Sequence, residues 1–141
     1  MQVIEHQYLH YRNVLVFEVQ MNTATIAECL SGIADSLNVL GLQPNGKTIF
    51  TCRDSVFEFV VPVGRTISSC QYYRFKPEFK LVNAVRARHY GSFSCIEDKV
   101  KKLFEYLAEH SLSPVTQPYY VARCLESEIY DIYIGINENV L

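Results

Sequence analysis

The chain has 141 residues, of which 49% are hydrophobic and 20% charged, and its net charge is −2. This length and composition are typical of one folded domain with its own core, and they exclude a disordered chain. The negative charge argues against a protein that binds nucleic acid by neutralising phosphates, and no apolar run approaches the roughly 18 residues of a membrane span.

The cysteines and the first residues bear on the compartment. Five cysteines, an odd number without C-x-x-C spacing, indicate reduced thiols more than a disulfide framework. The opening MQVIEHQYLHYRN has no basic segment followed by an apolar one, so no secretion signal is visible. We therefore expect a cytoplasmic protein.

The first half of the chain predicts the order β-α-β-β. A strand is expected over residues 13–20, followed by a helix near 25–40 whose apolar positions recur at helical spacing. Thr25 and Glu28 have the spacing of a capping box at the start of that helix. Two more strands are expected over 47–52 and 56–63.

The second half predicts the same order. A strand over 83–90 leads into a helix near 95–109, which Ser94 and Glu97 would cap, and strands over 118–124 and 129–136 follow. Apolar positions of the two halves match at an offset of 70, which becomes 73 after a three-residue insertion near 125–127.

This repetition predicts the fold class. We expect a single domain over 1–141 with an α+β fold, in which two β-α-β-β repeats, at about 3–64 and 73–137, are related by a pseudo-twofold axis. The sheets would be antiparallel, with helices on the outer face and a groove between the halves. Residues 65–73 would connect the repeats.

Alternation along the last strand of each half indicates which side chains are free for function. One face is apolar and should pack on the helices: Phe57, Phe59, Val61 and Val63 in the first half, and Tyr130, Ile132, Ile134 and Ile136 in the second. The opposite face carries Glu58 in the first half, and Asp131 and Tyr133 in the second.

Short motifs of the chain resemble the GyrI-like effector-binding domain, a bacterial family. Its pattern H-x-G-x-Y/F is matched by His89, Gly91 and Phe93. Its second pattern, E-[IL]-Y-I-P-[IV], is matched over 131–136 with Asp for Glu and Gly for Pro, and residues 58–63 keep the Glu and the Pro.

The resemblance implies a duplicated β-α-β-β fold with a ligand groove between the halves. Such domains occur alone or fused to DNA-binding modules, and their ligands are often aromatic or cationic, held by aromatic side chains and an acid. Some stand-alone members resemble hydrolases that use a Tyr and a Glu, and one subgroup inhibits DNA gyrase. This chain has no room for a separate DNA-binding domain, so we expect no nucleic-acid binding by itself.

Five residues are the candidate ligand contacts: Asp131, Tyr133, Tyr120, Glu58 and Glu128. Asp131 could instead pair with Arg86 or Arg88 of a neighbouring strand. The tyrosines could stack on a ligand or serve as core aromatics. Glu128, in the inserted loop with Glu126, could border the groove or be solvated.

Other polar residues suggest no chemistry. The four histidines lack the spacing of metal ligands, so no metal is predicted. The sequence has no glycine-rich phosphate loop, so no cofactor is predicted either. Cys95 has no histidine and acid at a recognisable spacing, so no catalytic residue is assigned. His89 is expected to stabilise the turn at Gly91, and Lys99 belongs to a solvated helix face.

The function expected from the sequence is binding of a small amphipathic, aromatic or cationic molecule in a central groove, without catalysis. One alternative is a hydrolase of the same fold that uses a Tyr and a carboxylate. Another is a protein-interaction module, gyrase-binding or toxin-associated, with a vestigial groove. A protein partner and a homodimer both stay open.

Overall fold

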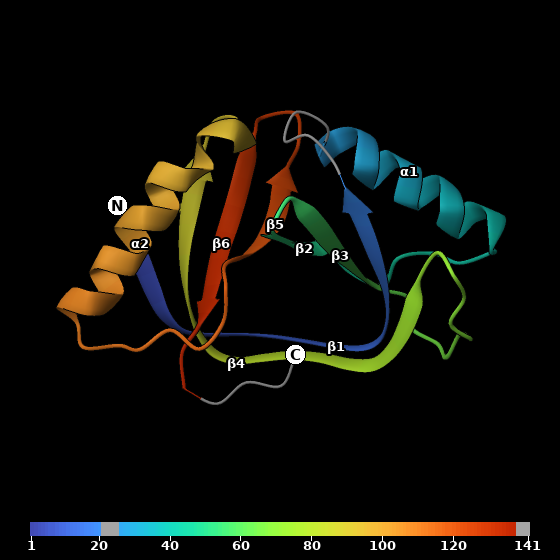
Figure 1. Cartoon of the computed structure of the whole chain (residues 1–141), viewed down its shortest axis with the longest axis horizontal. Helices are drawn as coiled ribbons and strands as arrows, with labels where there is room; N and C mark the ends of the chain where they lie inside the picture. The colour runs from blue at the N-terminus through green and yellow to red at the C-terminus, as the bar shows by residue number, and fades with distance from the viewer. Residues whose placement is uncertain (21–25, 138–141) are drawn as a thin grey trace. The chain divides into compact units, whose positions relative to one another are not determined.

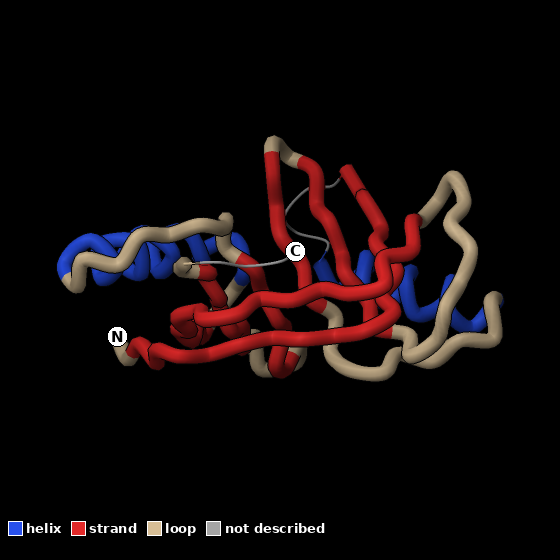
Figure 2. Tube along the Cα trace, turned by 90° about the horizontal axis from the view of Figure 1, so that it is seen from below, coloured by secondary structure: helices blue, strands red, loops and turns tan. Residues whose placement is uncertain are grey.

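The computed structural model describes residues 1–20 and 26–137. The strands and the two α-helices are labelled in Figure 1, and the chain is coloured by secondary structure in Figure 2. In chain order they are β1 (Val3–Gln20), α1 (Ile26–Val39), β2 (Ile49–Arg53), β3 (Val56–Pro62), β4 (Arg74–Tyr90), the short 3-10 helix η2 (Phe93–Cys95), α2 (Ile96–Glu109), β5 (Tyr119–Cys124) and β6 (Ile129–Gly135).

The predicted fold class is wrong in how the strands are joined. The described strands form a closed barrel in the order β1-β3-β2-β5-β6-β4. The α+β arrangement of two separate sheets with outer helices, a pseudo-twofold axis and a groove between halves is therefore incorrect. The cause is strand length: β1 begins at Val3 and β4 at Arg74, whereas the sequence predicted strands that begin only at residues 13 and 83.

The chain divides into two compact units, and both long strands contribute to each. Unit 1 contains residues 1–10 and the described residues from 80 onward, and unit 2 contains the described residues of 11–79. The beginning of β1 thus belongs to unit 1, and the beginning of β4 to unit 2. The single domain with repeats at 3–64 and 73–137 stays a prediction.

Unit 2 is built on three antiparallel strands in the order β1-β3-β2. Phe17 lies opposite Phe59, and Phe50 lies opposite the same residue from the other side. The rings of Phe50 and Phe59 stack with centroids 5.5 Å apart. Three residues of α1 at helical spacing are also buried, namely Ile26, Ile33 and Leu37. Each large apolar side chain buried in this way contributes about 1.5–3 kcal/mol to folding.

Unit 1 has the equivalent antiparallel order β4-β6-β5. Ile132 lies opposite Ala87 of β4 and Tyr120 of β5, and all three are buried. The ring of Phe93, just before α2, packs edge-on against the ring of Tyr120, with centroids 5.1 Å apart. Its centroid lies 5.4 Å from that of Tyr130. These ring contacts fix the start of α2 on the face of the sheet that carries Tyr130.

Backbone details recur in the two units at the offsets seen in the sequence. Asn13 and Asn83, 70 positions apart, both have left-handed backbones, with φ of 59° and 63°. The carbonyl of each accepts a hydrogen bond of 2.9 Å, from Val63 N–H and from Ile136 N–H, which are 73 positions apart. After each helix the same backbone bond of 2.8 Å forms, from Leu42 N–H to Leu37 and from Leu112 N–H to Leu107.

The helix caps differ from the prediction. Ser94 does not cap α2, because α2 begins at Ile96 after Cys95, which makes no side-chain cap bond. Instead Ser92 caps η2 by accepting from Ser94 N–H at 3.3 Å. The capping box predicted at Thr25 lies outside the described residues. No helix in the described part of the chain is long and apolar enough to cross a membrane.

Candidate functional site

Asp131 is held by arginines from both neighbouring strands. It lies opposite Arg88 of β4 and Val121 of β5 in the antiparallel register. Arg88 Nε donates to Asp131 Oδ1 at 2.8 Å, and Arg123 Nη1 donates to Oδ2 at 3.5 Å. The Asp131 side chain is only 2% exposed, against 32% for Arg88 and 47% for Arg123. The carboxylate is thus buried beneath two cationic groups.

This geometry matches the pairing with Arg88 that the sequence left open for Asp131. The hydrogen bond to Asp131 is the main cause that raises the pKa of Arg88. A carboxylate that already accepts from two guanidinium groups has little attraction left for a ligand cation. The expected cation contact at Asp131 is therefore not supported by its surroundings.

The two candidate tyrosines lie on opposite faces of the unit 1 sheet. Tyr133 shares the face of Asp131, opposite Tyr119 and Arg86, and burial raises its pKa, with a smaller contribution from the Asp131 charge. Tyr120 lies opposite Ile132 and contacts Phe93 on the helix face. The sequence contains two adjacent tyrosines, Tyr119 and Tyr120, but does not show how β5 is aligned with β6. It therefore could not decide which of the two lies on the same sheet face as Asp131.

Glu58 and Glu128 make contacts of their own. Glu58 belongs to unit 2, lies opposite Glu18 and pairs with Arg74 at 3.4 Å. Glu128 is exposed in the β5–β6 turn with φ of 52°, and its carbonyl accepts from Gly91 N–H at 2.8 Å. Among the candidates in unit 1, Asp131 and Tyr133 lie on one sheet face.

His89 stabilises the turn, as the sequence suggested. Its side chain is buried, and ring atom Nε2 lies 2.9 Å from the carbonyl oxygen of Ser92. The ring also lies 3.7 Å from the place where a Cβ on Gly91 would stand, and Gly91 has a φ of +126°. This position therefore has a structural explanation and needs no ligand.

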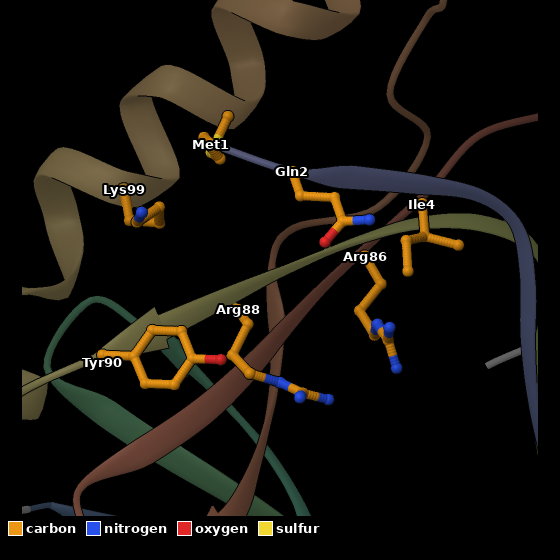
Figure 3. Close-up of a pocket in the computed structure, with 7 residues that line it drawn as sticks. All are labelled: Met1, Gln2, Ile4, Arg86, Arg88, Tyr90 and Lys99. Atoms are coloured by element: carbon orange, nitrogen blue, oxygen red, sulfur yellow. The ribbon is translucent and has the colours of Figure 1, made fainter.

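A cavity of about 210 Å³ opens in unit 1, and its lining includes Arg88, the ion-pair partner of Asp131 (Figure 3). Strand alternation places Arg86, Arg88 and Tyr90 of β4 on one face, and Figure 3 shows the Tyr90 hydroxyl directed toward Arg88. Lys99 of α2 completes the cationic part, and the remaining lining comes from the beginning of the chain: Met1, Gln2 and Ile4.

The lining of this cavity carries an excess of positive charge. Arg86, Arg88 and Lys99 are cationic, and none of the described residues that line the cavity is acidic. The charge of Arg88 is offset by its ion pair with Asp131. The charge of Arg86 is not offset in this way, because Arg86 interacts with the neutral hydroxyl of Tyr133. A small anion would therefore be attracted here, the opposite sign from the ligand expected at Asp131.

Sequence reasoning did not identify this cavity. It treated Arg86 and Arg88 only as partners for Asp131, and Lys99 as part of a solvated helix face. The alternation R-x-R-x-Y over 86–90 was the available signal, because it puts two guanidinium groups and a phenol on one side of a strand.

Comparison with known proteins gives a likeness of fold. No family model and no curated protein matches the chain. Crystal structures of two hydrolases from Listeria innocua match with TM-scores of 0.60 and 0.61, at 11% and 10% identity, over 96% of this chain and 90% and 91% of theirs. An uncharacterised conserved protein from the same organism matches with a TM-score of 0.62 at 10% identity, over 96% of this chain and 91% of its own. At such low identity these likenesses show the fold alone.

Proposed function

We propose that this protein binds a small amphipathic anion in the unit 1 cavity, without catalysis. The observation that carries the proposal is the placement of Arg86, Arg88 and Lys99 around one cavity whose described lining contains no acid. The nearby Ile4 and Met1 side chains offer apolar contact for the body of the ligand.

The chemistry of arginine favours a carboxylate or a phosphate as the charged group. A guanidinium group presents a planar fork of N–H donors that matches two oxygens of such a group. Asp131 engages Nε of Arg88 and holds the side chain in one orientation. A guanidinium group whose position is fixed before binding loses less conformational freedom when the ligand arrives.

The GyrI-like resemblance agrees with binding of a small molecule but not with a cation at Asp131. A hydrolase is the second candidate, because the Listeria proteins named hydrolases share the fold. It would need a carboxylate that can accept a proton near a tyrosine. Asp131 lies near Tyr133 but is held by two arginines, so non-catalytic binding is the better reading. A protein-interaction module would leave the cavity without a ligand.

Three probes with one toluene ring test the proposal: p-toluate, p-cresol and p-methylbenzylammonium. They carry negative, zero and positive charge at pH 7, so differences in affinity report on charge. We expect NMR titration to show p-toluate shifting amides near Arg86, Arg88 and Lys99, while p-methylbenzylammonium leaves them unchanged. Equal shifts with the cation would contradict the proposal.

Matched variants assign the binding to the cavity. Arg86→Gln and Lys99→Gln should each weaken p-toluate binding about fivefold to tenfold, because each removes one cationic contact of about 1–1.4 kcal/mol. Lys101→Gln is the control, since Lys101 is exposed on the same helix and does not line the cavity. Hydrolysis of p-tolyl acetate that disappears in Tyr133→Phe would favour the hydrolase instead.

A further inference from the structure

Unit 2 contains an apolar groove where unit 1 has a tyrosine. The groove has a volume of about 230 Å³ and is lined by Phe17 of β1, by Ser36, Val39 and Leu40 at the end of α1, and by Tyr72 and Tyr73. None of these described lining residues is charged. Val39 is 88% exposed and Tyr72 is 74% exposed, so apolar surface here faces solvent.

The equivalent place in unit 1 is closed by the chain itself. The ends of α1 and α2 correspond at an offset of 70, as the matching bonds from Leu42 to Leu37 and from Leu112 to Leu107 show. Tyr106 therefore occupies the position of Ser36. Its hydroxyl donates to Glu5 Oε2 at 2.6 Å, and its ring stacks on His110 with centroids 3.9 Å apart.

Ser36 is too short to make the contacts of Tyr106. Its hydroxyl turns back to donate to the Gly32 carbonyl of its own helix at 3.1 Å. The partner segment also differs, because Glu5 of unit 1 corresponds to Phe75, and Tyr72 and Tyr73 come just before it. The Tyr73 ring packs on Phe17 with centroids 5.6 Å apart, which forms one aromatic wall of the groove.

From this comparison we infer that the groove of unit 2 is a second ligand site, for a small neutral phenol or a similar single aromatic ring. The ring would take the place that the Tyr106 side chain has in unit 1, against Phe17, Tyr72 and Tyr73. Aromatic walls favour an aromatic occupant, and the absence of charge in the described lining disfavours a charged one.

This site is separate from the anion cavity in both residues and chemistry. The two share no lining residue, and one has three cationic side chains where the other has none. The proposed function and this inference can therefore fail independently.

NMR titration with p-cresol, which has the structure of a tyrosine side chain, tests the inference. Its hydroxyl stays protonated at pH 7 because a phenol has a pKa near 10. We expect a dissociation constant on the order of millimolar, as for other ligands of this size, with shifts at the amides of Phe17, Ser36, Val39 and Tyr73. The charged p-toluate should bind at this site at least tenfold more weakly.

A variant that copies unit 1 gives the sharpest control. Ser36→Tyr should fill the groove and weaken p-cresol binding at least tenfold, whereas Ser36→Ala should bind as the wild type does. Both changes lie on an exposed part of α1, so the protein should fold in each case. Unchanged p-cresol affinity in Ser36→Tyr, or shifts at other amides only, would overturn the inference.

A second copy of the chain is the competing occupant. If it filled the groove, the same amides would shift with protein concentration in the absence of p-cresol, and sedimentation would show a dimer. That result would overturn the small-molecule site. Concentration-independent spectra together with p-cresol shifts would support it.

Discussion

At the scale of single residues, the surroundings of Asp131 favour an anion over the cation that the sequence suggested. The carboxylate was predicted to attract a cation, but Arg88 and Arg123 already pair with it, and both arginines are far more exposed than the carboxylate is. A residue on the expected face of a strand can thus act by positioning its neighbours.

Replacing Asp131 with Asn should lower stability and strengthen anion binding. Loss of one partner from a buried ion pair costs about 3–5 kcal/mol, and we expect about 2 kcal/mol here because Arg88 can partly reach water. The freed charge of Arg88 should outweigh the loss of its fixed orientation, so the affinity for p-toluate should rise. Urea unfolding and NMR titration measure the two effects, and Asp98→Asn, on an exposed part of α2, is the control. Weaker p-toluate binding in Asp131→Asn would contradict this account.

Ionisation of Tyr133 should lower the stability of the protein at alkaline pH. Burial, and secondarily the Asp131 charge, raise its pKa in the folded state above 10. Between pH 10 and the folded pKa, only the unfolded state loses this proton, so stability is complete below pH 10 and falls as pH rises. Tyr133→Phe should flatten that decline in urea unfolding, whereas Tyr8→Phe, at an exposed site, should not. An unchanged slope in Tyr133→Phe would show that another group causes the decline.

At the scale of elements, the pairing of β1 with β3 and of β4 with β6 begins directly after one left-handed residue, Asn13 and Asn83 respectively. Asn83 has φ of 63°, and its carbonyl accepts from Ile136 N–H. Its buried side-chain oxygen has no hydrogen-bond partner within the described part of the chain. Asn83 therefore contributes through its backbone carbonyl and its left-handed conformation. Asn adopts this conformation more readily than most residues do.

Substitutions at Asn83 should separate backbone from side chain. Asn83→Gly should be at least as stable as the wild type, because glycine adopts positive φ freely and removes the unpaired oxygen. Asn83→Ala should lose about 1 kcal/mol from backbone strain. Chemical denaturation gives both values, and Asn38→Ala, in the ordinary helical backbone of α1, is the matched control. If alanine and glycine behave alike at position 83, strain is not the determinant.

How far the sequence predicts these elements depends on which forces define them. Helical and alternating apolar patterns are local, and α1, α2 and β6 lie close to the predicted ranges. The early start of β1 was missed because residues 3–10 mix polar and apolar side chains without a clear pattern. Residues 74–79 do alternate polar side chains with Phe75, Pro77 and Phe79, but the proline disfavours a strand. Pairing with other strands makes them β-structure, and such tertiary effects override local preference.

The candidate site was harder to predict for the same reason. The alternation of side chains along β6 correctly put Asp131 and Tyr133 on one sheet face and Tyr130 and Ile132 on the other, because alternation depends on one strand alone. Tyr120 was grouped with Asp131 and Tyr133 as a candidate contact without a face being assigned to it, and the register of β5 puts it opposite Ile132, on the other face. That register depends on hydrogen bonds between strands, which no single strand encodes. The cationic cavity needs β1, β4 and α2 together, so it follows only from the fold.

At the scale of the whole molecule, two independent sites should give additive stabilisation. A ligand that binds only the folded state at ten times its dissociation constant adds about 1.4 kcal/mol to the free energy of unfolding. With p-toluate and p-cresol together, the gain in urea unfolding should be the sum of the separate gains. A smaller joint gain would mean that the two molecules compete for one site, while Ser36→Tyr should retain the p-toluate gain alone.

The division of β1 between the two units has a consequence for folding during synthesis. Unit 2 is complete once residue 79 has left the ribosome, but residues 1–10 belong with the chain from 80 onward. At roughly 5–20 residues per second, the first strand segment waits several seconds for its partners. During this interval the segment with Ile4 and Tyr8 lacks the residues it contacts in unit 1, and a chaperone or another nascent chain has most access to it.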